Sequence, residues 1–260
     1  MLCAAPPRIG PNTKRLCRLA GMMLQSFPAA ARADWRAALA RTGVARLQGV
    51  PLDSDNRSLC ALGALLGRAS TRALPWRAGL VETGHVSRVQ ALPLPPLDQF
   101  GKPLLSAAYA DFALHSDESF CSRPARWVLL HCWRPDPKGA GASLLLAREE
   151  ILAGTDSSTR AALGCIALPY PVGNFPVVDA AGQVRFNAAE IAGEIHGRGR
   201  FATAAEARWV SHFEALFARL ASHCQLASGD LLIIDNQRVL HGRTAFARDS
   251  SRLLKRLRIY

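Results

Sequence analysis

Two His-x-Asp/Glu pairs are the first places in this sequence where side chains suited to a metal ion stand close together. His115 and Asp117 follow the apolar residues 112–114 in a stretch with the pattern of an extended strand, where positions i and i+2 project from the same face. His212 and Glu214 lie inside a segment of helical periodicity, where i and i+2 point about 200° apart and cannot chelate one ion. We therefore expect the first pair to bind a metal and the second to be structural.

His241 is the expected third ligand. It closes residues 231–241, in which an apolar strand, a short polar turn and a second apolar step follow one another. Two histidines and one carboxylate form the facial triad that holds non-haem Fe(II) and leaves coordination positions open for a cosubstrate and O₂. When this segment is taken by itself, the alternative is a histidine that only packs at the end of a strand.

Short strands are expected to carry these residues, with helices before and between them. The strand-like segments are 44–50, 127–133, 143–146, 231–234 and 252–260, and the helical ones are 34–41, 55–66 and the residues after Thr203. Residues 135–141 look like a turn between two strands of a hairpin, and the Pro-rich residues 91–100 are expected to form a loop bordering the site. The pattern favours a β-barrel or sandwich with helical additions.

Length and composition indicate one globular domain. The 260 residues are 49% hydrophobic, and none of the apolar stretches approaches the roughly 18 residues of a membrane helix. The N-terminal residues mix Pro, Lys and Arg, unlike a signal peptide, so we expect a cytoplasmic protein. We expect a single domain over 31–260, preceded by an N-terminal flank over 1–30. The seven scattered cysteines form no C-x-x-C pair, which indicates reduced, mostly buried thiols.

The net charge of +12 raises the question of a polyanionic partner. The excess is nearly all arginine, is spread along the chain without a run of five, and accompanies an Ala-rich composition. Nucleic acid and membranes are therefore not the expected partners, whereas a small anionic ligand is compatible with the charge. Ser119 has no Gly-x-Ser-x-Gly surroundings and the chain has no phosphate-binding glycine loop, so hydrolase and NTPase functions are not favoured.

Taken together, the motifs are similar in order and spacing to the taurine dioxygenase and clavaminate synthase-like family of Fe(II)/2-oxoglutarate oxygenases. The distal arginines of that family follow its second histidine at fixed distances, and here Arg252 and Arg256 follow His241 by 11 and 15 residues. The resemblance spans roughly residues 35–260. It rests on His115-Ser-Asp117, Gly141-Ala-Ser143, residues 229–236, His241-Gly-Arg243 and Arg252 to Arg256.

The resemblance implies a mainly β fold, a double-stranded β-helix or cupin-like jelly roll, with helices packed outside. It also implies that Fe(II) is bound by the catalytic residues His115, Asp117 and His241, with 2-oxoglutarate and O₂ as cosubstrates. Arg252 would form a bidentate salt bridge with the distal carboxylate of 2-oxoglutarate. Ser143 stands where the family has a threonine whose hydroxyl bonds to the same carboxylate.

The roles of the remaining polar residues follow from the same resemblance. Arg256 would reach either the inner carboxylate of 2-oxoglutarate or an anionic group of the substrate, and both alternatives stay open. Asn236 and Arg243, with Asp235, are expected to hold the turn around His241. Lys255 and Arg258 are expected at the surface, and His131 with Cys132 in the core.

The implied reaction is hydroxylation of an unactivated C–H bond of a small amino-acid-like or natural-product substrate, free or carrier-bound, with release of succinate and CO₂. Desaturation or epoxidation by the same family is the alternative outcome. A nucleic-acid-directed oxygenase or binding protein is a further alternative, supported only by the net charge. A non-catalytic metal-binding jelly roll is disfavoured by Arg252 and Ser143, because a bare metal module needs no cosubstrate clamp.

Overall fold

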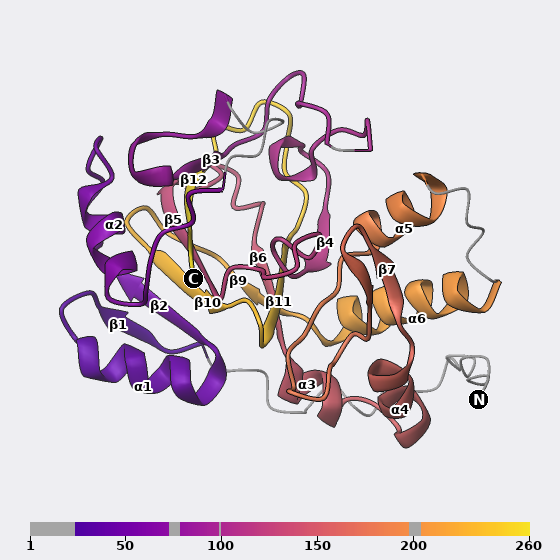
Figure 1. The fold of residues 1–260 in the computed structure, drawn as a ribbon. Helices are drawn as coiled ribbons and strands as arrows, with labels where there is room; N and C mark the ends of the chain where they lie inside the picture. Colours follow the sequence, from indigo (N-terminus) through magenta and orange to yellow (C-terminus); the bar gives the residue numbers. More distant parts are fainter. Residues whose placement is uncertain (1–23, 73–78, 99, 198–203) are drawn as a thin grey trace.

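Two β-sheets form the centre of the fold in a computed structural model, which describes residues 24–72, 79–98, 100–197 and 204–260 (Figure 1). The strands of the larger sheet are antiparallel except for β1, which runs parallel to β2. Their order is β1 (Ser26–Pro28), β2 (Val44–Gln48), β10 (Leu231–Asp235), β5 (Trp127–Arg134), β12 (Leu253–Ile259) and β3 (Ser87–Val89).

The smaller sheet is antiparallel throughout. Its order is β4 (Phe112–His115), β11 (Val239–Arg243), β6 (Ser143–Ala147) and β9 (Ser222–Cys224), and a separate hairpin joins β7 (Leu168–Tyr170) to β8 (Gly173–Phe175). One apolar cluster, which includes Val128 and Leu254 of the larger sheet and Leu145 and Val239 of the smaller, fills the space between the sheets. The sheets therefore face each other, as in a jelly roll.

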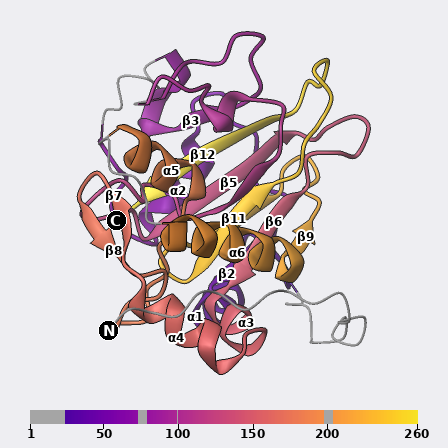
Figure 2. The same cartoon turned by 90° about the vertical axis from the view of Figure 1, so that its right-hand side faces the viewer.

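Helices cover the outer faces of both sheets (Figures 1 and 2). On the larger sheet, α1 (Arg32–Thr42) and α2 (Arg57–Ala64) pack through Trp35 and Leu59 in one cluster with Leu257 and Ile259 of β12. The smaller sheet is covered by α3 (Arg148–Ala153), α4 (Ser157–Cys165), α5 (Ala188–Gly197) and α6 (Ala204–Leu220). Short 3₁₀ turns at Thr83–His85 and Leu105–Ala107 lie in the segment between α2 and β4.

The mainly β prediction is confirmed, and each predicted strand and helix has a counterpart. The predicted hairpin around residues 135–141 is wrong, because β5 belongs to the larger sheet and β6 to the smaller, so the intervening residues cross between sheets. The helix predicted after Thr203 is α6, which buries Trp209 and Phe213, while Thr203 lies outside the described residues.

The single domain over 31–260 stays a prediction, and the structure adds one fact about its N-terminal border. Residues 26–28 of the expected flank form β1, which pairs with β2.

The five described cysteines are free thiols, and Cys121, Cys132 and Cys224 are buried. Among the described helices, none has the length and apolarity needed to cross a bilayer.

Candidate active site

His115, Asp117 and His241 lie together at the edge of the space between the two sheets. His115 ends β4, Asp117 follows two residues later, and His241 lies on β11 directly opposite His115 in the strand register. Their candidate ligand atoms all lie within 4.8 Å of one another. Oδ1 of Asp117 is 3.6 Å from Nε2 of His115 and 4.0 Å from Nε2 of His241. Within the described residues, these atoms form the one such group of three donors.

The His115 imidazole has the orientation that a metal ligand requires. Nδ1 of His115 lies 2.9 Å from the carbonyl oxygen of Ala113, which only accepts, so Nδ1 donates and the buried Nε2 is left without a hydrogen-bond partner. Phe112 stacks on the His115 ring at 3.9 Å. Burial and the neighbouring His115 lower the pKa of His241 to about 3, so its imidazole is neutral at neutral pH. The donor set therefore fits Fe(II).

Two buried arginines of β12 hold the carboxylate of Asp117. Nη1 of Arg256 donates to Oδ1 at 3.1 Å, and Nε of Arg258 donates to Oδ2 at 2.8 Å. Burial by itself raises the pKa of Asp117, but the charges of Arg256 and Arg258 outweigh burial and hold that pKa well below its usual range. The carboxylate is consequently an anionic donor throughout the physiological pH range.

Asn236 fixes the backbone of Asp117. Its Oδ1 accepts from the N–H of Asp117 at 2.7 Å, and its Nδ2 donates to the carbonyl oxygens of Asp117 at 2.9 Å and Ala125 at 2.8 Å. Asn236 belongs to the turn before His241, as expected, yet its side chain bonds to the segment after β4 rather than to that turn. Asp235 does stabilise the turn, since its Oδ1 accepts from the N–H of Gln237 at 3.2 Å.

A pocket lies beside His115 and His241 and has a strongly basic lining. Ser143, Arg252 and Arg256 all border it, as does Arg243. Burial lowers the pKa of Arg252 to about 10, so this guanidinium stays charged at neutral pH. Buried arginines and a hydroxyl suit a dicarboxylate that reaches the metal at one end.

Gly141 supports the position of Arg252. Its φ of 68° is favourable for glycine, and a Cβ atom at this residue would lie 2.8 Å from Cδ and Nε of Arg252. On another side, the guanidinium of Arg252 lies over the ring of Phe246, at 5.4 Å from its centroid. Backbone and ring thus confine the side chain from two directions.

Arg243 serves a segment other than the one expected. Its Nη2 donates to the carbonyl oxygens of Leu105 at 3.3 Å, Ala108 at 3.0 Å and Ala110 at 3.0 Å. These carbonyls belong to the chain leading into β4. Arg243 therefore fixes the approach to His115 instead of the turn around His241.

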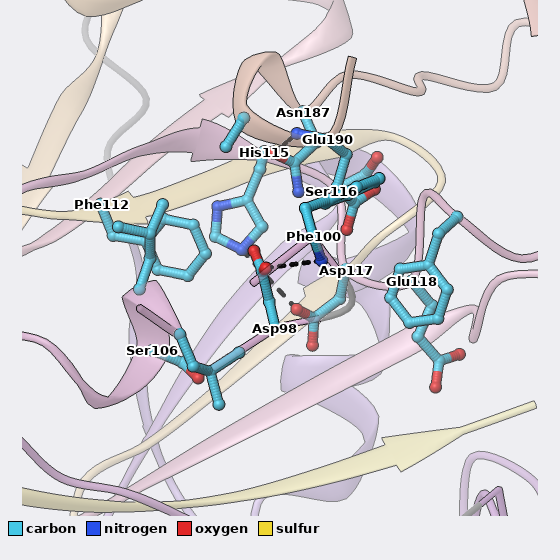
Figure 3. A pocket seen from close by; sticks show the side chains of 14 residues that line it. Asp98, Phe100, Ser106, Phe112, His115, Ser116, Asp117, Glu118, Asn187 and Glu190 are labelled. Carbon is cyan, nitrogen blue, oxygen red and sulfur yellow. Dashed lines mark hydrogen bonds and ion pairs between the residues drawn. The ribbon is translucent and has the colours of Figure 1, made fainter. Parts of the chain in front are cut away.

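A second pocket is lined by His115 and Asp117 (Figure 3). Its wall is formed by the Pro-rich loop through Asp98 and Phe100 and by the start of α5 through Asn187 and Glu190. None of the residues that line it in the described chain is Lys or Arg. Because it borders His115 and Asp117, this pocket suits a substrate that approaches the proposed metal site.

The expectation that Lys255 and Arg258 lie at the surface is wrong, because both are buried, at 4% and 7% exposure. Both faces of β12 are covered, one by the smaller sheet and the other by α2 and the segment before β3. Nζ of Lys255 bonds to Asn56 at 2.6 Å and Glu82 at 2.8 Å. The sequence signal for Arg258 was its period-2 spacing from Arg256, which puts both on one face of a strand.

The remaining histidine pair lies apart from this site. His212 and Glu214 are on α6, in separate surroundings from the triad, and Glu214 is exposed. His131 and Cys132 lie on β5 and are buried in the core, in agreement with their predicted positions.

Comparison with known proteins connects this geometry to a family. Residues 9–159 and 177–258 match the model of the taurine catabolism dioxygenase TauD, TfdA family. A search of the curated proteins finds no match.

Solved structures resemble this fold over most of the chain. One is an asparagine oxygenase in complex with Fe(II), 3-hydroxyasparagine and succinate, at 22% identity and a TM-score of 0.62, covering 89% of this chain and 79% of that one. Another is the non-heme iron oxygenase OrfP with Fe, succinate and a dihydroxy-L-Arg, at 18% identity and a TM-score of 0.53, covering 90% and 81%. OrfP has also been solved with Fe and α-ketoglutaric acid, at a TM-score of 0.52.

Proposed function

Since this chain belongs to the TauD/TfdA family, and so is an Fe(II)- and 2-oxoglutarate-dependent dioxygenase, we propose that it hydroxylates an unactivated C–H bond of a small amino-acid-like substrate. Succinate and CO₂ are the co-products. The observation that carries the assignment to this site is the meeting of three buried donors within 4.8 Å beside a pocket lined by Arg252 and Ser143. We assign Fe(II) to His115, Asp117 and His241.

When bound, iron and 2-oxoglutarate supply the O₂ activation and the oxidative decarboxylation that drive C–H oxidation. The contribution of the chain is binding and orientation. Arg252 and Ser143 bind the distal carboxylate of 2-oxoglutarate. Arg256 lines the same pocket and is absent from the lining of the other one, which supports a contact with the inner carboxylate rather than with substrate.

The second pocket supports a substrate that carries an ammonium group, as amino acids do. Asp98 and Glu190 line it, and their carboxylates make its wall anionic. The names of the similar solved structures support the same class, because those oxygenases are in complex with a hydroxyasparagine and a dihydroxy-L-Arg. A free amino acid is the form tested first, and a carrier-bound one is tested second.

The decisive test of the iron site is anaerobic addition of Fe(II) and 2-oxoglutarate. We expect the visible metal-to-ligand charge-transfer band of a chelated 2-oxo acid, because three protein ligands leave room for a bidentate one. Zn(II) gives no such band. If well-folded, iron-loaded protein shows no band with 2-oxoglutarate, the proposed site is wrong.

The substrate class is tested by coupled succinate release over matched panels. We expect amino acids to stimulate succinate formation, and sulfonates and aryloxyacetates to leave it at the uncoupled rate. Mass spectrometry of the stimulating compound distinguishes hydroxylation, which adds one oxygen, from desaturation, which removes two hydrogens. Stimulation by aryloxyacetates alone would overturn the amino-acid proposal.

A further inference from the structure

Arg258 contacts the outward oxygen of the proposed carboxylate ligand. Its Nε donates to Oδ2 of Asp117 at 2.8 Å, whereas the two histidines and Arg256 face the other oxygen, Oδ1. The side chain of Arg258 is 8% exposed. Arg258 lines neither the basic pocket beside Arg252 nor the second pocket beside Asp98 and Glu190. Its contacts are therefore with the metal site's own carboxylate and not with a place where a small molecule would sit.

Glu118 gives Arg258 a second anionic neighbour. Nε of Arg258 lies 3.8 Å from Oε1 of Glu118, and Oε2 accepts from Tyr260 at 2.9 Å and from the N–H of Ala125 at 3.0 Å. Glu118 has a φ of 59°, a left-handed conformation that non-glycine residues adopt only when their surroundings impose it. One guanidinium thus spans two consecutive buried carboxylates at the turn that presents Asp117.

Two different constraints act on Asp117. Asn236 bonds to its backbone N–H and carbonyl, which places the residue, but leaves the rotation of the carboxylate about its own bond free. Arg258 is the group that contacts Oδ2 and so restricts this rotation. A carboxylate with both oxygens unrestrained is able to chelate a metal through both and so take up a position that the cosubstrate or O₂ requires.

We propose that Arg258 is a positioning residue that occupies Oδ2 of Asp117, so that this carboxylate binds iron through Oδ1 alone and leaves three positions open. The proposal rests on the proposed function. Glu118 balances the charge of Arg258 and fixes the turn. Arg256 differs in that its contact is with Oδ1, the oxygen directed at the metal site.

The test compares Arg258→Met and Arg258→Lys with the parent protein and with Arg134→Met, in which an exposed arginine of β5 is replaced. Co(II) and 2-oxoglutarate affinities and the visible Co(II) spectrum are measured without turnover. We expect Arg258→Met to retain Co(II) within about tenfold, to weaken 2-oxoglutarate by more than about tenfold, and to change the Co(II) spectrum. Lysine should restore part of the loss, since its ammonium reaches one carboxylate but lacks the planar fork.

The possible outcomes distinguish a failure of the positioning role of Arg258 from a failure of the proposed function. A charge-transfer band in the parent supports the proposed function whatever the variants do. If Arg258→Met and Arg134→Met both keep the parent's 2-oxoglutarate affinity and Co(II) spectrum, the positioning role is refuted. Should Arg258→Met not fold, Arg258→Lys and Glu118→Gln decide: both are expected to alter the spectrum, and parent-like spectra in both overturn the proposal.

Discussion

Arg252 is the residue on which the proposed 2-oxoglutarate site should depend most. Replacing it by alanine leaves the distal carboxylate of 2-oxoglutarate without its buried charged partner, which costs on the order of 3 kcal/mol or more, about a 100-fold loss of affinity. Iron affinity should change little, because Arg252 makes no contact with the triad. Titration of 2-oxoglutarate by the charge-transfer band measures the effect, with Arg134→Ala as control. If the affinity for 2-oxoglutarate is unchanged, another residue binds its distal carboxylate, and Arg256 is the next candidate.

Asp117 and Glu214 provide a matched pair of carboxylates, one buried in the proposed site and one exposed on α6. We choose Asp117→Asn, because alanine would leave Arg256 and Arg258 buried opposite an empty space. Asparagine removes the anionic donor, so iron affinity should fall by more than about tenfold and coupled succinate release should be lost. Glu214→Gln should keep both within about twofold. Bound iron and succinate are measured side by side.

The reverse pattern for these two variants would place the metal elsewhere. Loss of iron in Glu214→Gln with normal turnover in Asp117→Asn contradicts the site built on His115. The two histidine pairs look alike in the sequence, so this comparison tests the geometric argument that distinguishes them.

At the scale of elements, the close approach of β11 to β4 positions the two histidines. Gly242 follows His241, and a Cβ atom there would lie 2.5 Å from the backbone oxygen of Phe112. Backbone cannot move aside as a flexible side chain does, so Gly242→Ala should force the strands apart. We expect a loss of stability of about 1 to 3 kcal/mol and weaker iron binding.

Chemical denaturation of the metal-free protein and iron titration check the effect of Gly242→Ala. The control is Gly164→Ala, because a Cβ atom at Gly164 meets its nearest atom at 3.8 Å, an ordinary contact. If the Gly242 variant matches the parent in both measurements, the strand contact is not what sets the separation of the histidines.

At the scale of the whole molecule, we expect His131 to make the folded protein less stable in acid. Burial lowers the pKa of His131 within the larger sheet. Between that lowered pKa and about 6.5, the unfolded chain therefore binds a proton that the folded protein excludes, so stability falls as the pH falls below about 6.5. His131→Gln should reduce this slope by up to about 1.4 kcal/mol per pH unit. The free energy of unfolding of metal-free protein at several pH values measures it.

Exposed His223 supplies the control for the acid prediction. His223→Gln should leave the pH slope of the parent in place, because folding leaves the His223 side chain in contact with water. Equal slopes for His131→Gln and the parent would show that acid sensitivity originates in other groups.

Local patterns in the sequence were sufficient to predict the three candidate metal ligands and most of the helices and strands. The i, i+2 spacing of His115 and Asp117 in an extended segment places both on one face, and the spacing of Arg252 and Arg256 after His241 matches the family. The apolar periodicity of α6 and the strands at 231–235 and 253–259 are equally local, because backbone geometry repeats every few residues. The family match confirms the class of enzyme that these features suggested.

Only the tertiary structure decided which partners meet these donors. All seven residues of β12 are buried, so the strand has no exposed polar face to distinguish it in the sequence, and Arg258 was expected at the surface. The sequence likewise did not show that β5 and β6 belong to different sheets. Nor did it show that Asn236 bonds to Asp117, which lies far from it in the sequence. Such contacts depend on strand order and register, which are fixed by how whole faces bury one another rather than by neighbouring residues.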